Sequence, residues 1–257
     1  MEDVITDIPP PSRFFNEDLN NFALPSPALP SPFFVFSKPD SNFPLRPSLL
    51  VVAISPPSIY LLHHCIPSKT LIGTLILPEI SFSGNPIEPS HRSKSCDIYA
   101  SIDDPAILFM SVQLPVAGER AYAVAKLIID EGEIRPERVL ILDSVQSRNF
   151  RGNLSADEML VFKLETSSTS GQQMVCGVGW FPSGSMVDGL GAALLTRCQM
   201  RRIQGTLCVS WPECGPSAVA LVKSLLDNSV LSKLDVRAFD GDCDVGFDRI
   251  KDSELYA

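Results

Sequence analysis

Two serine-containing segments have the residue types of a hydrolytic site. Asp143-Ser144 follows the apolar run Val139 to Leu142, and Ser183-Gly184-Ser185 precedes a segment with helical spacing. Enzymes that alternate strands and helices place catalytic groups at such strand ends. The base for a serine nucleophile would come from the histidines, which are His63, His64 and His91. No Gly-x-Ser-x-Gly motif is present, so this pattern fits only a diverged α/β hydrolase or phosphorylase-like enzyme, which we carry as the alternative hypothesis.

Motifs for phosphate, nucleotide or metal binding are not found. The chain has no Gly-x-x-x-x-Gly-Lys-Ser/Thr loop, and Gly189-Leu190-Gly191 lacks the third glycine of a dinucleotide fingerprint, which favours close helix packing. The seven cysteines form neither Cys-x-x-Cys nor a Cys/His ligand set. Asp240 to Gly246 departs from a calcium loop and is interpreted as a solvated acidic linker. We therefore expect no cofactor and no metal.

Arg197, Arg201 and Arg202 lie close together near the end of a predicted helix. Cations are stabilised in the last turn of a helix because its carbonyl dipoles point there. The same three guanidinium groups could instead bind an acidic partner. The sequence leaves both interpretations open.

The last three residues, Leu255-Tyr256-Ala257, combine three groups that one binding slot can accept. The leucine fits an apolar wall, the phenol can hydrogen-bond, and a terminal carboxylate pairs with a lysine or with backbone amides. They follow an acidic segment, Asp240 to Glu254, that has little apolar material with which to fold alone. The ending is thus the candidate partner-binding motif.

Three regions are predicted from composition. Residues 1–47 hold ten of the 22 prolines and are predicted to be a mostly disordered arm, although some of its phenylalanines could fold back onto the domain. Residues 48–240 are predicted to form one α/β domain, whose ordered structure is expected to begin at Leu49. Residues 241–257 are predicted to be an acidic flexible tail.

Apolar periodicity predicts the elements that would position these groups. Buried or partly buried strands are expected at 49–54, 71–77, 98–102, 107–114, 139–142, 160–164, 206–209 and 234–239. Helices are expected over 118–130, from a Ser185-x-x-Asp188 capping box to about Arg201, and from about Ser217. Strands and helices that alternate in this way predict a single three-layer αβα domain with a mixed or mostly parallel sheet.

The net charge of -9 and the pI near 4.8 argue against binding to nucleic acid or to anionic membranes. No apolar run reaches the roughly 20 residues that cross a bilayer. The acidic start Met1-Glu2-Asp3 is unlike a secretory leader, and the scattered cysteines suit reduced thiols. We therefore expect a cytoplasmic protein, and the sequence leaves a nuclear location open.

The chain resembles the proteasome assembly chaperone 1 family over about 50–257. The resemblance rests on the first buried strand, on Ile107 to Leu114 followed by Gly118-Glu119-Arg120, and on the passage from Val187-Asp188-Gly189-Leu190 through Cys198-Gln199 to Trp211. The hydrophobic–Tyr–X ending of that family matches Leu255-Tyr256-Ala257. The proline-rich arm 1–47 has no counterpart that we can place.

The resemblance implies a phosphorylase-like scaffold without catalytic residues. It implies a heterodimer with the second chaperone of the pair, which together assist the assembly of the 20S proteasome. Proteasome α-type subunits would be the further partners, with the C-terminal tail docked in a pocket between neighbours in the α-ring. The implied role is a scaffold that promotes ring formation.

Overall fold

The structure is a computed structural model that describes residues 29–37, 44–81, 93–114, 116–131, 134–155, 158–167, 173–229 and 231. The chain divides into a first unit, 1–30, and a second unit, 31–257. Only Leu29 and Pro30 of the first unit are described. The helices and strands of the described residues all belong to the second unit.

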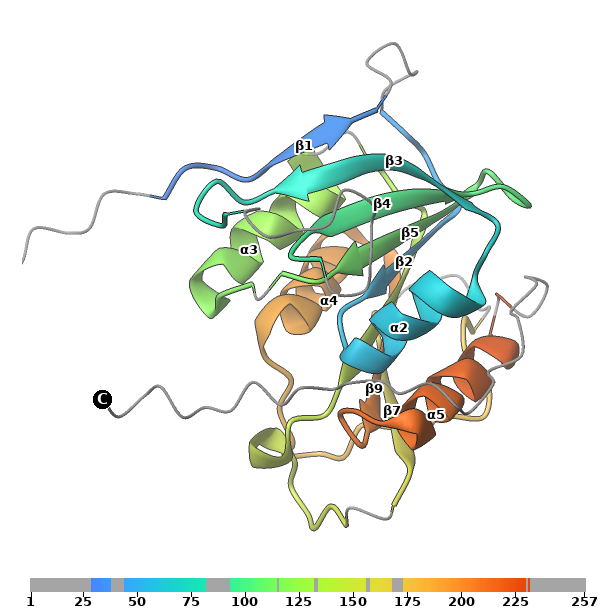
Figure 1. Cartoon of the computed structure of the whole chain (residues 1–257). Helices are drawn as coiled ribbons and strands as arrows, with labels where there is room; N and C mark the ends of the chain where they lie inside the picture. Colours follow the sequence, from blue (N-terminus) through green and yellow to red (C-terminus); the bar gives the residue numbers. More distant parts are fainter. Residues whose placement is uncertain are drawn as a thin grey trace, which may run out of the picture. The chain divides into compact units, whose positions relative to one another are not determined.

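Nine strands of the described residues form one mixed sheet in the order β1-β3-β4-β5-β2-β6-β9-β7-β8. The strands are β1 Phe33–Phe36, β2 Leu49–Ala53, β3 Lys69–Ile76, β4 Cys96–Ser101, β5 Ile107–Val112, β6 Arg138–Ser144, β7 Leu160–Glu165, β8 Gly179–Trp180 and β9 Gln204–Trp211. Figure 1 shows the sheet running from β1 at one edge to β7 near the other.

The centre of the sheet is parallel. Strand β2 pairs in parallel with β5 on one side and with β6 on the other, and β6 pairs in parallel with β9. All five residues of β2 are buried, which is the expected state of a strand covered on both faces. The continuous apolar run at 49–54 correctly predicted this strand.

The β1 side of the sheet is antiparallel. Strands β4 and β5 form a hairpin whose turn holds Asp104, which accepts a hydrogen bond from the backbone N–H of Ala106. Strand β1 pairs with β3, and Phe34 and Phe36 pack against the core beneath it. The expectation that order begins at Leu49 was therefore wrong, because aromatic residues within the range given to the arm form an edge strand.

Four α-helices of the described residues cover the two faces of the sheet, which confirms the three-layer αβα prediction with a mixed sheet. They are α2 Pro56–Cys65, α3 Gly118–Lys126, α4 Gly189–Arg201 and α5 Pro216–Asp227. Helices α2 and α5 pack together on one face, and α3 packs with α4 on the other (Figure 1). Each pair encloses its own apolar core, so the sheet is buried between two cores.

The structure corrects or completes several local predictions. The capping box does not form: α4 begins at Gly189, and the Asp188 side chain makes no cap hydrogen bond to it. Helix α3 continues as one π-helical turn, η1 Leu127–Glu131. Helix α2 was not predicted, because most of its residues are buried and it shows no clear amphipathic spacing. The strand expected at 234–239 lies outside the described residues.

Candidate functional site

The carboxyl ends of the parallel strands bring Asp143 and Ser144 to one edge of the sheet. Asp143 Oδ1 accepts a hydrogen bond of 2.8 Å from the backbone N–H of Ser144. Burial raises the pKa of Asp143 to about 6; the hydrogen bond from Ser144 opposes this shift, while the charges of Asp188 and Glu213 add to it. A carboxyl with this environment exchanges protons near neutral pH.

The segment before α4 reaches the same edge but is held by other contacts. Asp188 Oδ2 accepts a hydrogen bond of 2.9 Å from Asn149 and lies 3.6 Å from the guanidinium of Arg148. Ser185 Oγ accepts a hydrogen bond from the backbone N–H of Arg151. Residues of both segments line one small hollow.

That hollow has a volume of about 20 Å³ and is lined by Asp143, Ser144, Asn149, Met186 and Asp188 among others. About one water molecule fits in such a volume. Pockets that hold small-molecule substrates are typically 300–1,000 Å³. The deep polar pocket that the enzyme hypothesis requires is therefore not formed at this edge.

The two described histidines, His63 and His64, lie on helix α2. His63 Nε2 lies 3.2 Å from Ser111 Oγ and 2.8 Å from Gln113 Nε2, on the α2 face near β5. His64 stacks on Tyr60, and burial followed by the charge of Lys69 lowers its pKa. His91 lies outside the described residues.

Sequence reasoning missed a polar network beneath α2. Ser95 Oγ donates to Asp97 Oδ2 and bonds to Gln113 Oε1, and Gln113 contacts His63. Asp97 lies opposite Ser111 in the β4–β5 pair. Ser111 is fully buried, so its contact with His63 stabilises the core and does not meet a substrate. The sequence signal that could have revealed this network is a polar residue at an inward position of each strand, Asp97 in β4 and Ser111 in β5.

Metal binding has no support in the described residues, which contain no group of three or more His, Cys, Asp or Glu that could hold an ion. Cys65, Cys96, Cys198 and Cys208 are buried, whereas Cys176 and Cys214 are exposed, and none of these six forms a disulfide. Burial raises the pKa of Cys198 and of Cys208 to about 12, so both thiols stay protonated.

Two of the three clustered arginines are tied to one carboxylate. The guanidinium groups of Arg197 and Arg201 both pair with Asp130, which lies in the π turn after α3. Arg197 is buried, whereas Arg201 and Arg202 are exposed. The arginines therefore do more than balance the dipole of α4, because they join α4 to the end of α3.

The predicted partner-binding motif, Leu255, Tyr256 and Ala257, lies outside the described residues, as does all of 232–257. None of the described helices is both long and apolar enough to cross a bilayer.

Comparison with solved structures identifies the fold. PbaB of Pyrococcus furiosus, an archaeal proteasome activator, matches with a TM-score of 0.52 and 13% identity over 81% of this chain and 91% of that chain. A protein of unknown function from Thermoplasma acidophilum matches with a TM-score of 0.52 and 16% identity, over 75% and 78% of the two chains. PbaA of Pyrococcus furiosus, an archaeal homologue of proteasome-assembly chaperone, matches with a TM-score of 0.49 and 15% identity, over 77% and 81%.

No protein-family model matches the chain, and the search of curated proteins gave no match. At 13% and 16% identity, the two structures with TM-scores above 0.5 establish a shared fold. The α/β fold of this protein is thus similar to the folds of PbaB and of the Thermoplasma acidophilum protein.

Proposed function

We propose that this protein is a non-catalytic chaperone that promotes 20S proteasome assembly by scaffolding the α-ring. The observation that carries the proposal is the fold shared with PbaB, described as an archaeal proteasome activator, over most of both chains. The Leu255-Tyr256-Ala257 ending adds to it, because it combines the groups that a slot between neighbouring subunits can accept. The protein would act as a heterodimer with a second chaperone of the pair.

The tail is the proposed docking element. From Gly241 to Ala257 the chain has 16 bonds, and a flexible segment of that length spans roughly 20–24 Å root-mean-square. It can therefore leave the domain and enter a pocket of a neighbouring α subunit. One tripeptide binds weakly, since ordering the tail offsets part of the contact energy. A second contact through the domain or the partner chaperone would raise the effective concentration.

The absence of catalysis in the proposal is supported by the strand-end site. Its hollow of about 20 Å³ is too small for a substrate. A scaffold needs no substrate pocket.

Affinity capture tests the docking motif. Tagged full-length protein is mixed with purified α-type subunits, and the bound subunits are quantified. Replacing Tyr256→Ala, or deleting residues 255–257, is expected to reduce capture about tenfold or more, because burial of a large side chain contributes roughly 1.5–3 kcal/mol.

Ser253→Ala is the matched control, since it changes the same tail outside the motif. Equal capture by the wild type and by the chain lacking residues 255–257 would refute tail docking. Failure of the wild type to capture any α subunit would refute the chaperone proposal itself.

Purification of the tagged chain from cells tests the proposed heterodimer and its location in the cell. The second chaperone of the pair is expected to copurify in a one-to-one ratio, and the complex is expected in both cytoplasmic and nuclear fractions. A complex that contains this chain alone, as a stable homodimer, would contradict the heterodimer.

A further inference from the structure

The outer surface of α3 and α4 carries exposed apolar side chains around a fixed guanidinium. Arg197 lies over the ring of Tyr122 at 5.4 Å, and it donates a hydrogen bond of 3.2 Å to the Tyr122 hydroxyl. Its Nη1 also lies 3.9 Å from Met200 Sδ. Tyr122 is 57% exposed and Met200 is 62% exposed. Arg197 therefore holds the two apolar groups side by side at the surface.

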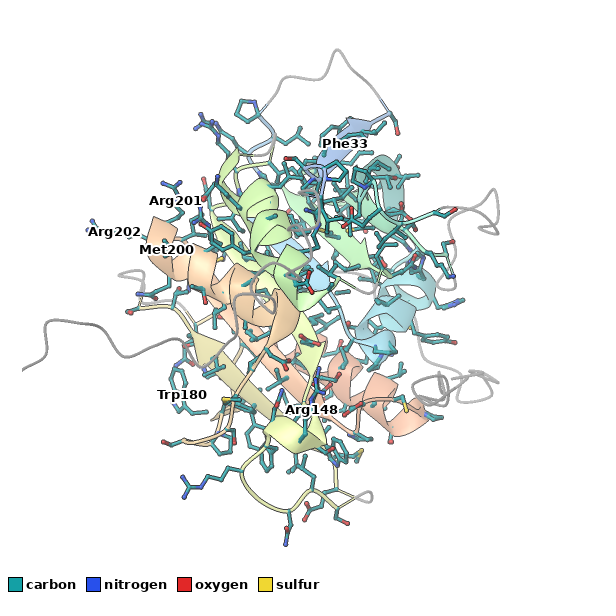
Figure 2. The ribbon with its side chains drawn as sticks, turned by 90° about the vertical axis from the view of Figure 1, so that its left-hand side faces the viewer. Phe33, Arg148, Trp180, Met200, Arg201 and Arg202 are labelled. Atoms are coloured by element: carbon teal, nitrogen blue, oxygen red, sulfur yellow. The ribbon has the colours of Figure 1, made fainter. Side chains whose placement is uncertain are left out.

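This surface is also basic, although the chain as a whole is acidic. Arg197 and Arg201 share Asp130, so one carboxylate faces two guanidinium groups. Arg202 adds a third, with no hydrogen bond or ion pair recorded for its side chain within the described part of the chain. We call Tyr122, Arg197, Met200, Arg201 and Arg202 the α3–α4 patch. Figure 2 shows Met200, Arg201 and Arg202 grouped at one end of α4.

Arg202 occupies a position that usually belongs to glycine. It follows the last residue of α4 with φ 58° and ψ 29°, and Ile203 N–H donates to Cys198 O across it. Such left-handed residues that close a helix are most often glycine, because a side chain is strained there. A glycine would serve the helix better, which indicates that the guanidinium has a separate role.

We propose that the α3–α4 patch binds the acidic segment 240–248 of this same chain. That segment contains Asp240, Asp242, Asp244 and Asp248, no cation, and the apolar residues Val245 and Phe247. The carboxylates complement Arg201 and Arg202, and Phe247 packs on the exposed Tyr122 and Met200. The following residues, 249–254, are nearly balanced in charge, so the attraction is concentrated in 240–248.

The chain is long enough for this contact. Two residues separate α4 from β9. After α5, Ser229 forms a bridge with Val175, whose carbonyl accepts a hydrogen bond from Lys163 of β7, so the chain lies near the β7 side of the sheet at residue 229. The nine residues from 232 to 240 extend up to about 30 Å. Two helix layers on opposite faces of a sheet lie roughly 20 Å apart, since packed layers are spaced by about 10 Å. The segment can therefore pass around the sheet edge to the patch.

Tethering makes a weak contact sufficient. A short flexible linker gives an effective concentration in the millimolar range. A contact with a dissociation constant of about 0.2 mM would then be mostly formed within the molecule. Because exposed ion pairs are screened by salt, the contact is expected to open as the ionic strength rises. Docking of 240–248 would shorten the free tail to residues 249–257, which span roughly 15–18 Å from the patch, so the terminal motif would stay free to bind but with a shorter reach than in the undocked chain.

Nuclear magnetic resonance relaxation of the full-length protein tests the contact. In 50 mM salt the backbone order parameters of 240–248 are expected to exceed about 0.7, and in 0.5 M salt they are expected to fall below about 0.6, the range of flexible chain. Arg202→Gly is expected to give the flexible value even in low salt. This variant removes the cation and relieves the left-handed strain, so it should fold at least as well as the wild type.

Replacing Asp242→Asn and Asp244→Asn together is expected to release the segment and to shift the methyl signal of Met200 to the same position as in Arg202→Gly. Arg148→Ala is the matched control, since Figure 2 shows Arg148 as an arginine on a distant part of the same unit. Deletion of 255–257 should also leave 240–248 ordered. Low order parameters in the wild type, or equal effects of Arg148→Ala and Arg202→Gly, would overturn the proposal. So would order that depends on protein concentration, which would assign the patch to a second copy of the chain.

Discussion

Asp143 carries a charge that its surroundings disfavour. Burial raises its pKa to about 6 from an ordinary 3.8. The folded state therefore holds the proton more tightly than the unfolded state, so this group contributes stability below pH 3.8 and loses it as pH rises through 6. At pH 7 the buried carboxylate is a net cost to folding.

Asp143→Asn should therefore stabilise the protein at neutral pH. The amide oxygen can still accept the hydrogen bond from the Ser144 N–H. Two pKa units correspond to about 3 kcal/mol, so the free energy of unfolding at pH 7 is expected to rise by about 1–3 kcal/mol. The gain is expected to shrink as pH falls from 6 toward 4. Urea unfolding at several pH values measures both effects.

Asp103→Asn is the matched control, because Asp103 lies exposed in the β4–β5 turn. Its effect is expected to stay within about 0.5 kcal/mol at every pH. A gain for Asp143→Asn that is the same at pH 4 and pH 7 would show that the cause is packing and that the pKa of Asp143 is not raised.

At the scale of elements, β1 depends on a close approach that only glycine allows. A Cβ on Gly73 would lie 2.7 Å from Phe36 Cδ1 and 3.0 Å from the Val35 carbonyl oxygen. Gly73→Ala should therefore push β1 away from β3 and destabilise the fold by about 1–3 kcal/mol. Hydrogen exchange is expected to accelerate at the β1 amides before it does so at β2.

Gly179→Ala serves as the comparison, since a Cβ there meets no atom within 4 Å and the residue also lies in a strand near a sheet edge. It should leave exchange in β1 unchanged. If Gly73→Ala behaved in the same way, the contact between β1 and β3 would be looser than the structure has it.

The sequence predicted best those elements whose apolar residues follow one clear pattern. Continuous apolar runs identified the buried strands, and i, i+3, i+4 spacing identified α3 and α5. Helix α2 was missed because it is apolar on nearly all sides. The interpretation of Gly189-Leu190-Gly191 as close packing is confirmed at Gly191, where a Cβ would lie 2.6 Å from Asp143 Oδ2. That contact joins α4 to β6. The local sequence pattern does not predict which strand a helix will pack against.

The candidate sites divide in the same way. The sequence correctly placed Asp143-Ser144 at a strand end, because a buried run ends there. It could not give the size of the hollow or the position of His63, which depend on how α2 packs on the sheet. The arginine cluster was visible, but its sharing of Asp130 with η1 depends on the packing of α3 against α4. The Leu255-Tyr256-Ala257 prediction stays a prediction.

For the whole molecule, the C-terminal region divides into a helix that the fold needs, α5, and a tail that it does not need. The core on the α2–α5 face includes Val219, Val222, Leu225, Leu226 and Leu231, all of which are buried. Each such side chain contributes roughly 1.5–3 kcal/mol when buried, and a typical domain has only about 5–15 kcal/mol of net stability. The fold should therefore tolerate loss of the tail but not of α5.

A chain ending at residue 231 is expected to unfold cooperatively with a stability within about 1 kcal/mol of the full-length protein, because it keeps both cores. A chain ending at residue 215 lacks α5 and is expected to be unfolded or aggregated, since it exposes half of one core to water. Thermal unfolding followed by circular dichroism distinguishes the two. Capture of α-type subunits by the folded 1–231 chain is expected to fall as it does on deletion of 255–257. If 1–231 were instead unfolded, residues beyond Leu231 would belong to the core, and loss of capture on truncation could no longer be assigned to the terminal motif.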